Sequence, residues 1–124
     1  MRYLVDGMNV IGTRPDQWWR DRSAARRKLV QALSTMCDGA AVTVVFDGRP
    51  DAGELDEAAG SGVMVRFAPG GPNAADDVIA SYVGDDPEPS SLVVVTSDGA
   101  LAGKVRALGA AVMGSNTFRQ RLDR

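Results

Sequence analysis

The sequence predicts an α/β fold with a mainly parallel central sheet and helices on both faces. Apolar, strand-like runs alternate along the chain with segments of helical periodicity, a pattern typical of parallel strands joined by right-handed crossovers. Three of these runs end in Asp-Gly, with the aspartates Asp6, Asp47 and Asp98. Because the carboxyl ends of parallel strands meet at one edge of a sheet, we expect the three aspartates to converge there. Asp-Gly is also a common turn signal, which is the simpler interpretation of each pair alone.

Length and composition indicate one globular domain spanning residues 1–124. The chain is 44% hydrophobic and 24% charged, without low-complexity segments, and its length suffices for a proper core. The N-terminus enters a strand directly, and no segment approaches the roughly 18 to 20 apolar residues that span a bilayer. We therefore expect a cytoplasmic protein that does not associate with membranes.

In the first half of the chain, residues 2–6 are predicted to form a buried strand and residues 7–22 a loop. A helix follows, with Ser23 as its N-cap and a stop at Gly39. It is indicated by apolar residues at helical spacing, namely Ala25, Leu29, Leu33 and Met36. Residues 41–47 are a second strand, and 49–62 are expected to be a loop with at most a short helix.

In the second half, residues 63–67 alternate like a strand before a Pro- and Gly-rich break. A helix capped by Asn73 is indicated by one apolar stripe, made of Ala75, Val78, Ile79, Tyr82 and Val83. The remaining predicted elements are a hydrophobic strand at 92–96, a helix over about 100–108, a short strand at 110–113 and a terminal helix from Ser115.

Two further aspartates open the helix that follows Asn73. At about 100° per residue, Asp76 borders the apolar face and Asp77 points away from it. Both acids would also complement the positive end of the helix dipole. Asp76 is the better candidate for joining the three strand-end aspartates.

The chain contains no histidine and one cysteine. This composition excludes the usual Ser-His-Asp and Cys-His nucleophile systems and His/Cys zinc sites. Cys37, on the apolar side of its helix pattern, is expected to be a small core residue. The abundant carboxylates instead suit Mg²⁺ or Mn²⁺, which prefer oxygen ligands.

Basic residues are concentrated in one stretch, although the formal net charge is −2. They form either a solvated helix face or a track for a phosphate backbone, and they are Arg14, Arg20, Arg22, Arg26, Arg27 and Lys28. The candidates for contact with a phosphate backbone nearest the strand ends are Arg14, Arg20, Arg22 and Arg49. Trp18 or Trp19 has the chemistry to stack on an unpaired base, and we expect at least one of them to pack under the loop instead.

Residues 4–12, Leu-Val-Asp-Gly-Met-Asn-Val-Ile-Gly, resemble the opening motif of the NYN domains, a group of PIN-like ribonucleases. The resemblance extends over essentially the whole chain through residues 45–48, 75–77 and 94–98, and it is closest to the YacP-like bacterial branch. It implies a three-layer PIN-like fold and a divalent-metal-dependent endoribonuclease. RNA is the implied substrate, either free or associated with the ribosome.

The resemblance also implies roles for individual residues. Asp6, Asp76 and Asp98 match the metal-site carboxylates, Asp47 is a further acidic member and Asp77 a lesser metal candidate. Asn9 matches the family asparagine, for orienting Asp6, holding a water or contacting the scissile phosphate. Ser97 either supports this site by hydrogen bonding or caps the following helix, and Ser115 and Asn116 have the same two interpretations. Many NYN domains carry another Asp where this chain has Ala100, which puts a second metal in doubt.

A carboxylate-held divalent ion neutralises the phosphate and activates water near pH 7, so we expect products with a 5′-phosphate and a 3′-hydroxyl. One alternative is a non-catalytic RNA- or ribosome-binding module. Another is a receiver-like domain with Asp47 as the phosphoacceptor, although residues 111–114 offer no phosphate-pairing lysine. An aspartyl-phosphate phosphatase is disfavoured because Met8 stands two residues after Asp6, where an acid is expected.

Overall fold

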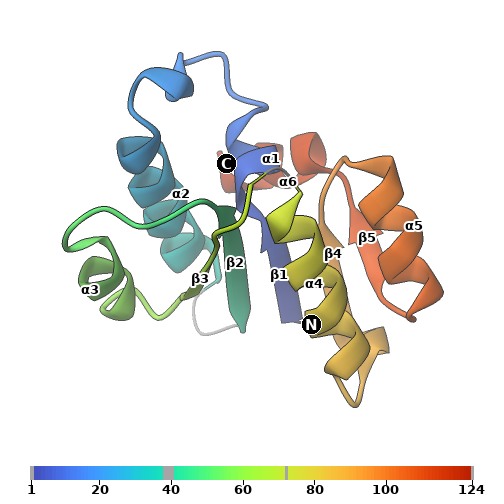
Figure 1. Cartoon of the computed structure of the whole chain (residues 1–124). Coiled ribbons are helices and arrows are strands. Elements are labelled where there is room, and N and C mark those ends of the chain that lie inside the picture. The colour runs from blue at the N-terminus through green and yellow to red at the C-terminus, as the bar shows by residue number, and fades with distance from the viewer. Residues whose placement is uncertain (1, 38–40, 72, 124) are drawn as a thin grey trace.

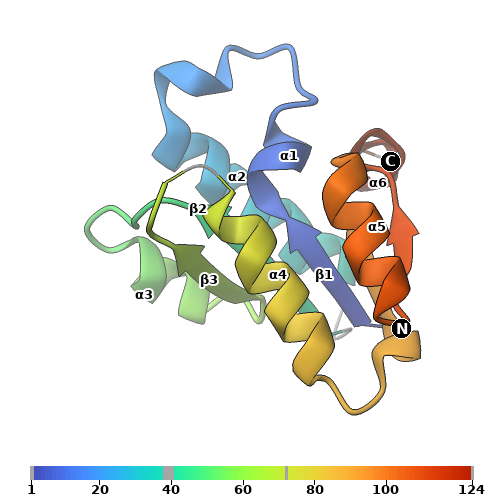
Figure 2. The same cartoon turned by 45° about the vertical axis from the view of Figure 1, so that its right-hand side comes forward.

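The computed structural model describes residues 2–37, 41–71 and 73–123. Within them, five strands form one parallel sheet in the order β3-β2-β1-β4-β5 (Figures 1 and 2). The strands are β1 (Arg2–Asp6), β2 (Val42–Asp47), β3 (Met64–Ala68), β4 (Leu92–Val95) and β5 (Ala111–Met113). The predicted α/β class and parallel sheet are therefore confirmed.

Helices cover both faces of this sheet. They are α1 (Gly7–Ile11), α2 (Arg22–Cys37), α3 (Glu54–Ala59), α4 (Ala74–Asp85), α5 (Gly99–Ala107) and α6 (Ser115–Leu122), with short 3₁₀ turns at Trp18–Arg20 and Pro89–Ser91. None of the helices in the described ranges is both long and apolar enough to cross a bilayer.

The core consists of two apolar clusters, one on each face of the sheet. Val5 and Phe46 pack with α1, α2 and α6, whereas Leu4 and Val45 pack with α4 and α5. Successive strand residues point to opposite faces, and here both faces are covered. That is why the central strands β1, β2 and β4 read as continuous apolar runs. The edge strand β3 alternates between exposed and more buried residues.

The strand order reverses between β1 and β4. The chain runs from β1 outward to β2 and β3, then returns through α4 to β4 on the other side of β1. In open parallel sheets such a reversal leaves a crevice outside the carboxyl ends of the two strands. The fold therefore places the residues that follow β1 and β4 at the edge where ligands bind.

The predicted loop over 7–22 was wrong in part, because α1 begins immediately after β1. A Cβ on Gly7 would overlap the Phe46 ring, so only glycine allows α1 this close to β2. A helix of five residues is too short to give a periodic signal in the sequence. The loop from Arg49 does contain one short helix, α3, as expected.

One predicted helix cap was wrong and another was right only in position. Helix α2 begins at Arg22, and the Asp21 carboxylate accepts a hydrogen bond from the Ala24 backbone N–H at 3.0 Å, the role expected of Ser23. Asn73 occupies the N-cap position of α4, but its backbone is left-handed (φ 67°) and its side chain makes no capping hydrogen bond. The predicted helix stop at Gly39 and the side chain of Cys37 lie outside the described part of the structure.

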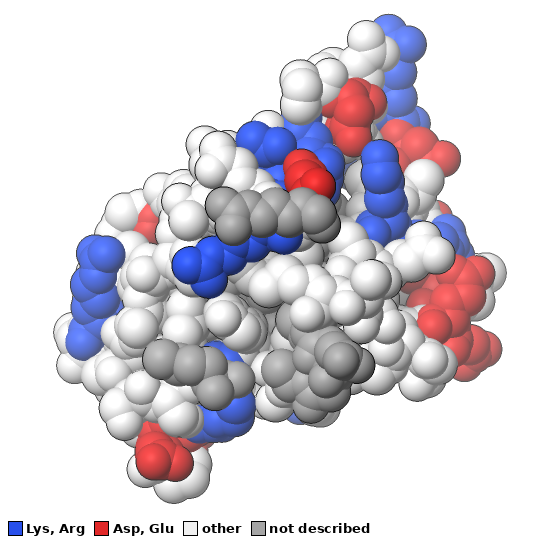
Figure 3. All heavy atoms as spheres, turned by 180° about the vertical axis from the view of Figure 1, so that it is seen from behind, with Lys and Arg blue, Asp and Glu red and all other residues white. Residues whose placement is uncertain are grey.

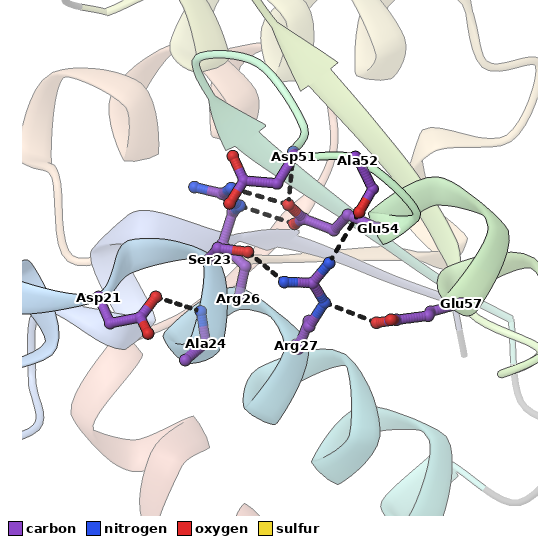
Figure 4. A network of polar contacts seen from close by, with 9 residues as sticks. All are labelled: Asp21, Ser23, Ala24, Arg26, Arg27, Asp51, Ala52, Glu54 and Glu57. Carbon is purple, nitrogen blue, oxygen red and sulfur yellow. Dashed lines mark hydrogen bonds and ion pairs between the residues drawn. The ribbon is translucent and has the colours of Figure 1, made fainter.

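A buried ion pair joins α2 to the segment after β2 (Figure 4). Arg26 donates to both carboxylate oxygens of Glu54, at 2.7 and 2.8 Å, and the Asp51 backbone N–H donates to one of them at 3.0 Å. On the surface nearby, Arg27 pairs with Glu57 at 2.6 Å. Arg26 and Arg27 thus hold α3 and its loop to α2, which corrects their interpretation as a solvated face or phosphate track.

We predict that Glu54→Ala destabilises the protein by about 3–5 kcal/mol, because it leaves the buried Arg26 guanidinium without a counter-charge. The matched control is Glu57→Ala, whose exposed pair with Arg27 contributes less than about 1 kcal/mol. Urea unfolding of the three proteins measures both values. Equal losses for the two variants would contradict the assignment of the buried pair as the main link.

Candidate active site

Four aspartates gather at the carboxyl edge of the sheet, the upper edge in Figure 1. Asp6 is the last residue of β1 and Asp47 the last of β2, whereas Asp98 follows β4 and Asp76 lies in the first turn of α4. Their charges act on one another. The charges of Asp76 and Asp47 raise the pKa of Asp6, and those of Asp98 and Asp47 raise the pKa of Asp76. The sequence predicted this common location.

Asp6 is the buried member of the group, with 5% of its surface exposed. Thr96 donates a hydrogen bond from its hydroxyl to Asp6 Oδ2 at 3.0 Å, and the Asp98 backbone N–H donates to that hydroxyl at 3.1 Å. Burial raises the pKa of Asp6 to about 6, opposed by the Thr96 hydrogen bond and increased further by the neighbouring carboxylates. The ionised form of Asp6 is therefore costly without a cation.

Asp47 and Asp98 each cap a helix with one carboxylate oxygen. Asp47 Oδ1 accepts from the Ala75 backbone N–H at 2.9 Å, at the start of α4. Asp98 Oδ1 accepts from the backbone N–H groups of Ala100 and Leu101, at 2.9 and 3.1 Å. In the described residues their second oxygens accept no hydrogen bond, so these oxygens are free for a ligand.

The α4 aspartates differ as the helix geometry predicted. Asp76 is partly buried and Asp77 is exposed. Burial raises the pKa of Asp76, as do the negative charges of Asp98, Asp47 and Asp77, and Lys104 of α5 lowers it. Lys104 is thus a cation near the site that sequence reasoning did not single out.

Asn9 lies in α1, three residues after Asp6. Its side-chain Oδ1 accepts hydrogen bonds from the Ser97 backbone N–H at 2.8 Å and from the Ser115 hydroxyl at 2.5 Å. Ser97 Oγ accepts from the Ser115 backbone N–H at 2.9 Å. Ser97 therefore caps α6, whereas Asp98 caps the helix that directly follows it.

The residues expected to contact RNA differ in their surroundings. Arg14 pairs with Asp123 at 2.8 Å, whereas Arg20, Arg22 and Arg49 are exposed and form no ion pair within the described ranges. Figure 3, from behind relative to Figure 1, shows basic side chains at separated places with acidic ones between them. No continuous basic track appears on that face.

The two tryptophans divide between packing and exposure, as expected for at least one of them. Trp18 packs against the core on the α2 face, with the Arg22 guanidinium 5.2 Å from the centre of its ring. Trp19 is 55% exposed and meets Trp18 edge to face. Trp19 is therefore the ring that is available to a nucleobase.

The donor chemistry of this edge suits a hard divalent cation, since it offers free carboxylate oxygens whose mutual repulsion a cation would relieve. The side chains do not form a ready-made cage: across residues 2–37, 41–71 and 73–123, no three Asp, Glu, Cys or His side chains stand at metal-binding spacing. Binding of an ion to Asp6, Asp76 and Asp98 thus requires side-chain movement.

Sequence reasoning missed one polar residue that organises the site. Thr96 links Asp6 to Asp98, and its position directly before Ser97 and Asp98 was the available signal. Ser115 was left open between supporting the site and capping a helix, and in the structure it is fully buried with its hydroxyl on Asn9. Nothing local in the sequence indicates that partner, which lies 106 residues away.

This chain is similar in fold to solved structures over almost its whole length. Two are crystal structures of Rae1 (YacP) from Bacillus subtilis. One has a TM-score of 0.78 and 26% identity over 99% of this chain and 74% of that chain. The other, a single-residue variant, has a TM-score of 0.76 and 24% identity over 99% of this chain and 76% of that chain. No curated protein sequence matches this chain.

The sequence profile of the YacP-like NYN domain matches residues 3–124. The chain therefore belongs to the YacP-like NYN family, in agreement with the resemblance seen in its motifs. This family is a branch of the PIN-like nucleases, and membership supports a ribonuclease function.

We predict that Asp6→Asn stabilises the metal-free protein at neutral pH. A carboxyl whose folded pKa is raised from 3.8 to about 6 favours folding below pH 4, and this contribution is lost as the pH rises to about 6. Above pH 6 the ionised Asp6 costs at most about 3 kcal/mol, which the amide removes.

Thermal unfolding in EDTA at pH 4 and pH 7.5 measures this effect. Asp6→Asn is expected to have a higher melting temperature than the unchanged protein at pH 7.5, and no higher melting temperature at pH 4. Asp77→Asn, an exposed neighbour, is the control and should show little gain at either pH. A gain of equal size at both pH values would contradict the burial argument.

Proposed function

We propose that this chain is a divalent-metal-dependent endoribonuclease whose site is the carboxylate cluster at the reversal of the strand order. The observation that carries the proposal is the burial of Asp6 beside other carboxylates, an arrangement that is unfavourable unless a cation neutralises it. Membership of a PIN-like nuclease family agrees with it.

In this proposal Asp6, Asp76 and Asp98 hold Mg²⁺ or Mn²⁺, with Asp47 beside them and Asp77 at the rim. The bound ion neutralises charge on the phosphate and lowers the pKa of an attacking water. Asp47 and Asp98 keep one oxygen on a helix N-terminus, which fixes their orientation. Asn9 is the neutral polar member of the site.

The reaction proposed is hydrolysis of an RNA phosphodiester bond. The water oxygen forms a new bond to phosphorus on the side opposite the leaving oxygen, and the bond from phosphorus to the 3′ oxygen breaks. One proton of the water passes to a site carboxylate or to solvent, and the 3′ oxygen gains a proton. The products carry a 5′-phosphate and a 3′-hydroxyl.

RNA binding is assigned to the exposed side chains near this edge. Arg20, Arg22 and Arg49 supply charge for phosphates, Arg14 contributes if it leaves Asp123, and the tryptophans supply a stacking surface. Trp19 replaces Trp18 as the proposed stacking ring, because Trp18 is packed and lies under Arg22. We place this activity in the cytoplasm, on free or ribosome-associated RNA.

The strand order argues against the receiver-like alternative. Receiver domains have the order 2-1-3-4-5, whereas this sheet has 3-2-1-4-5. The Asp47 carboxylate is also engaged as a helix cap. A non-catalytic RNA-binding module remains the competing function, and the cleavage experiment separates it from a nuclease.

We expect a labelled single-stranded RNA to be cut by the protein with Mg²⁺ or Mn²⁺ and to stay intact with EDTA. Asp6→Asn should reduce cutting by at least about 100-fold, because it removes a charge from the proposed metal site. Products with a 2′,3′-cyclic phosphate would contradict the proposed chemistry.

The same proteins distinguish a nuclease from a binding module. Metal ions should raise the melting temperature of the unchanged protein through binding to the folded state, and should not raise that of Asp6→Asn. Such a rise together with RNA binding and no cutting would favour the binding module. The absence of any metal effect would overturn the metal-site assignment.

We predict that Trp19→Ala weakens RNA binding by about 1–3 kcal/mol, the usual value for losing a base–aromatic stack, without lowering stability. Trp18→Ala should instead lower the free energy of unfolding, because this ring packs against the core. Fluorescence anisotropy with a labelled RNA and urea unfolding test the pair. Unchanged RNA affinity in Trp19→Ala would exclude the stacking role.

A further inference from the structure

The orientation of the Asn9 amide is determined by two hydrogen-bond donors. The Ser97 backbone N–H and the Ser115 hydroxyl both reach the same side-chain atom, at 2.8 and 2.5 Å. A backbone N–H cannot face an amide NH₂ group, so the atom between them must be the carbonyl oxygen. The NH₂ group of Asn9 therefore points away from the two serines.

This NH₂ group has no partner within the described part of the chain. No hydrogen bond in that part has Asn9 Nδ2 as its donor, and the only side-chain polar atom there that is both buried and unpaired is Arg119 Nε. The amide nitrogen is consequently exposed to solvent. Asn9 thus offers two N–H donors while its oxygen is fully engaged.

Asn9 itself lies at the carboxylate edge. The Asn9 backbone N–H stabilises the Asp6 carboxylate, and Ser97, which holds the Asn9 oxygen, directly precedes Asp98. A phosphate oxygen only accepts hydrogen bonds, and the carboxylates around it offer none. The amide NH₂ is a neutral donor, so it binds a phosphate oxygen and does not compete with the carboxylates for a cation.

The Ser115 hydroxyl contacts Asn9 and takes no part in the cap of α6. Ser115 is fully buried at the first position of α6, and its backbone N–H donates to Ser97 Oγ at 2.9 Å. The cap of α6 therefore depends on the Ser97 side chain and on the Ser115 backbone. The Ser115 hydroxyl donates to Asn9 and is not needed for the cap.

We propose that Ser115 is a positioning residue that fixes the Asn9 amide so that its N–H groups donate to a non-bridging phosphate oxygen of bound RNA. This inference rests on the proposed function, since it concerns the substrate of the same site. Ser97 acts with Ser115 through its backbone N–H, which no side-chain substitution removes.

A double-mutant cycle tests the coupling between the two residues. Ser115→Ala is expected to lower kcat/KM for RNA cleavage by about 10-fold, the effect of one hydrogen bond, and Asn9→Ala by more. In the Asn9→Ala background, Ser115→Ala should have no further effect. Thr117→Ala, an exposed change on the same helix, is the matched control and should have none in either background.

The cycle has two results that would overturn the proposal. One is a loss in Ser115→Ala that persists in the Asn9→Ala background, which would mean that Ser115 acts through general stability. The other is unchanged cleavage by Ser115→Ala. Melting temperatures of all four proteins show whether a loss of folding accounts for any change.

A measurement without turnover separates this inference from the proposed activity. In ¹⁵N-labelled protein, the Asn9 side-chain NH₂ signals should shift when a short RNA is added in EDTA, and Ser115→Ala should broaden them. Unmoved signals with RNA bound elsewhere would overturn the phosphate contact. If the unchanged protein cuts no RNA and the signals still shift, the proposed nuclease function fails and the Asn9 contact stands.

Discussion

The ionised carboxylate of Asp6 is the constraint on which the site depends. Asp6 is the last residue of β1 and is buried where the strand order reverses, beside Thr96 at the end of β4 and near Asp76 in the first turn of α4. The Thr96 hydroxyl only partly compensates for this burial. The surrounding elements therefore hold Asp6 where its ionised form is unfavourable without a cation, with Asp47, Asp76 and Asp98 nearby.

Most of the fold was predictable because its signals are local. Strands covered on both faces appear as continuous apolar runs, and α4 appears as one apolar stripe at helical spacing. The alternation of these elements then indicates a parallel sheet, and its carboxyl edge brings together Asp6, Asp47 and Asp98. Helix α1 was not predicted, because a helix of about one and a half turns is too short to show an apolar periodicity in the sequence. Its close approach to Phe46 depends on Gly7.

The details of the site could not be predicted, because its hydrogen bonds join residues far apart in the sequence. Asp47 caps α4 in place of the neighbouring Asn73, and Ser115 reaches Asn9 across the sheet edge. Each of these polar groups has a sensible local interpretation as a turn or a cap. Only the three-dimensional arrangement decides which donor meets which acceptor.

The ion pairs of α2 and its neighbours also limit how the chain meets a polyanion. Of the six basic residues between 14 and 28, four have acidic partners: Arg14, Arg26, Arg27 and Lys28. In the proposed function, Arg20, Arg22 and Arg49 are left for phosphates, and three such contacts give a slope of only about −2 for the logarithm of RNA affinity against that of salt concentration. Long-range attraction would then contribute little to RNA binding. The choice of target would depend on the shape of the RNA strand at the site and on the concentration at which that strand is presented.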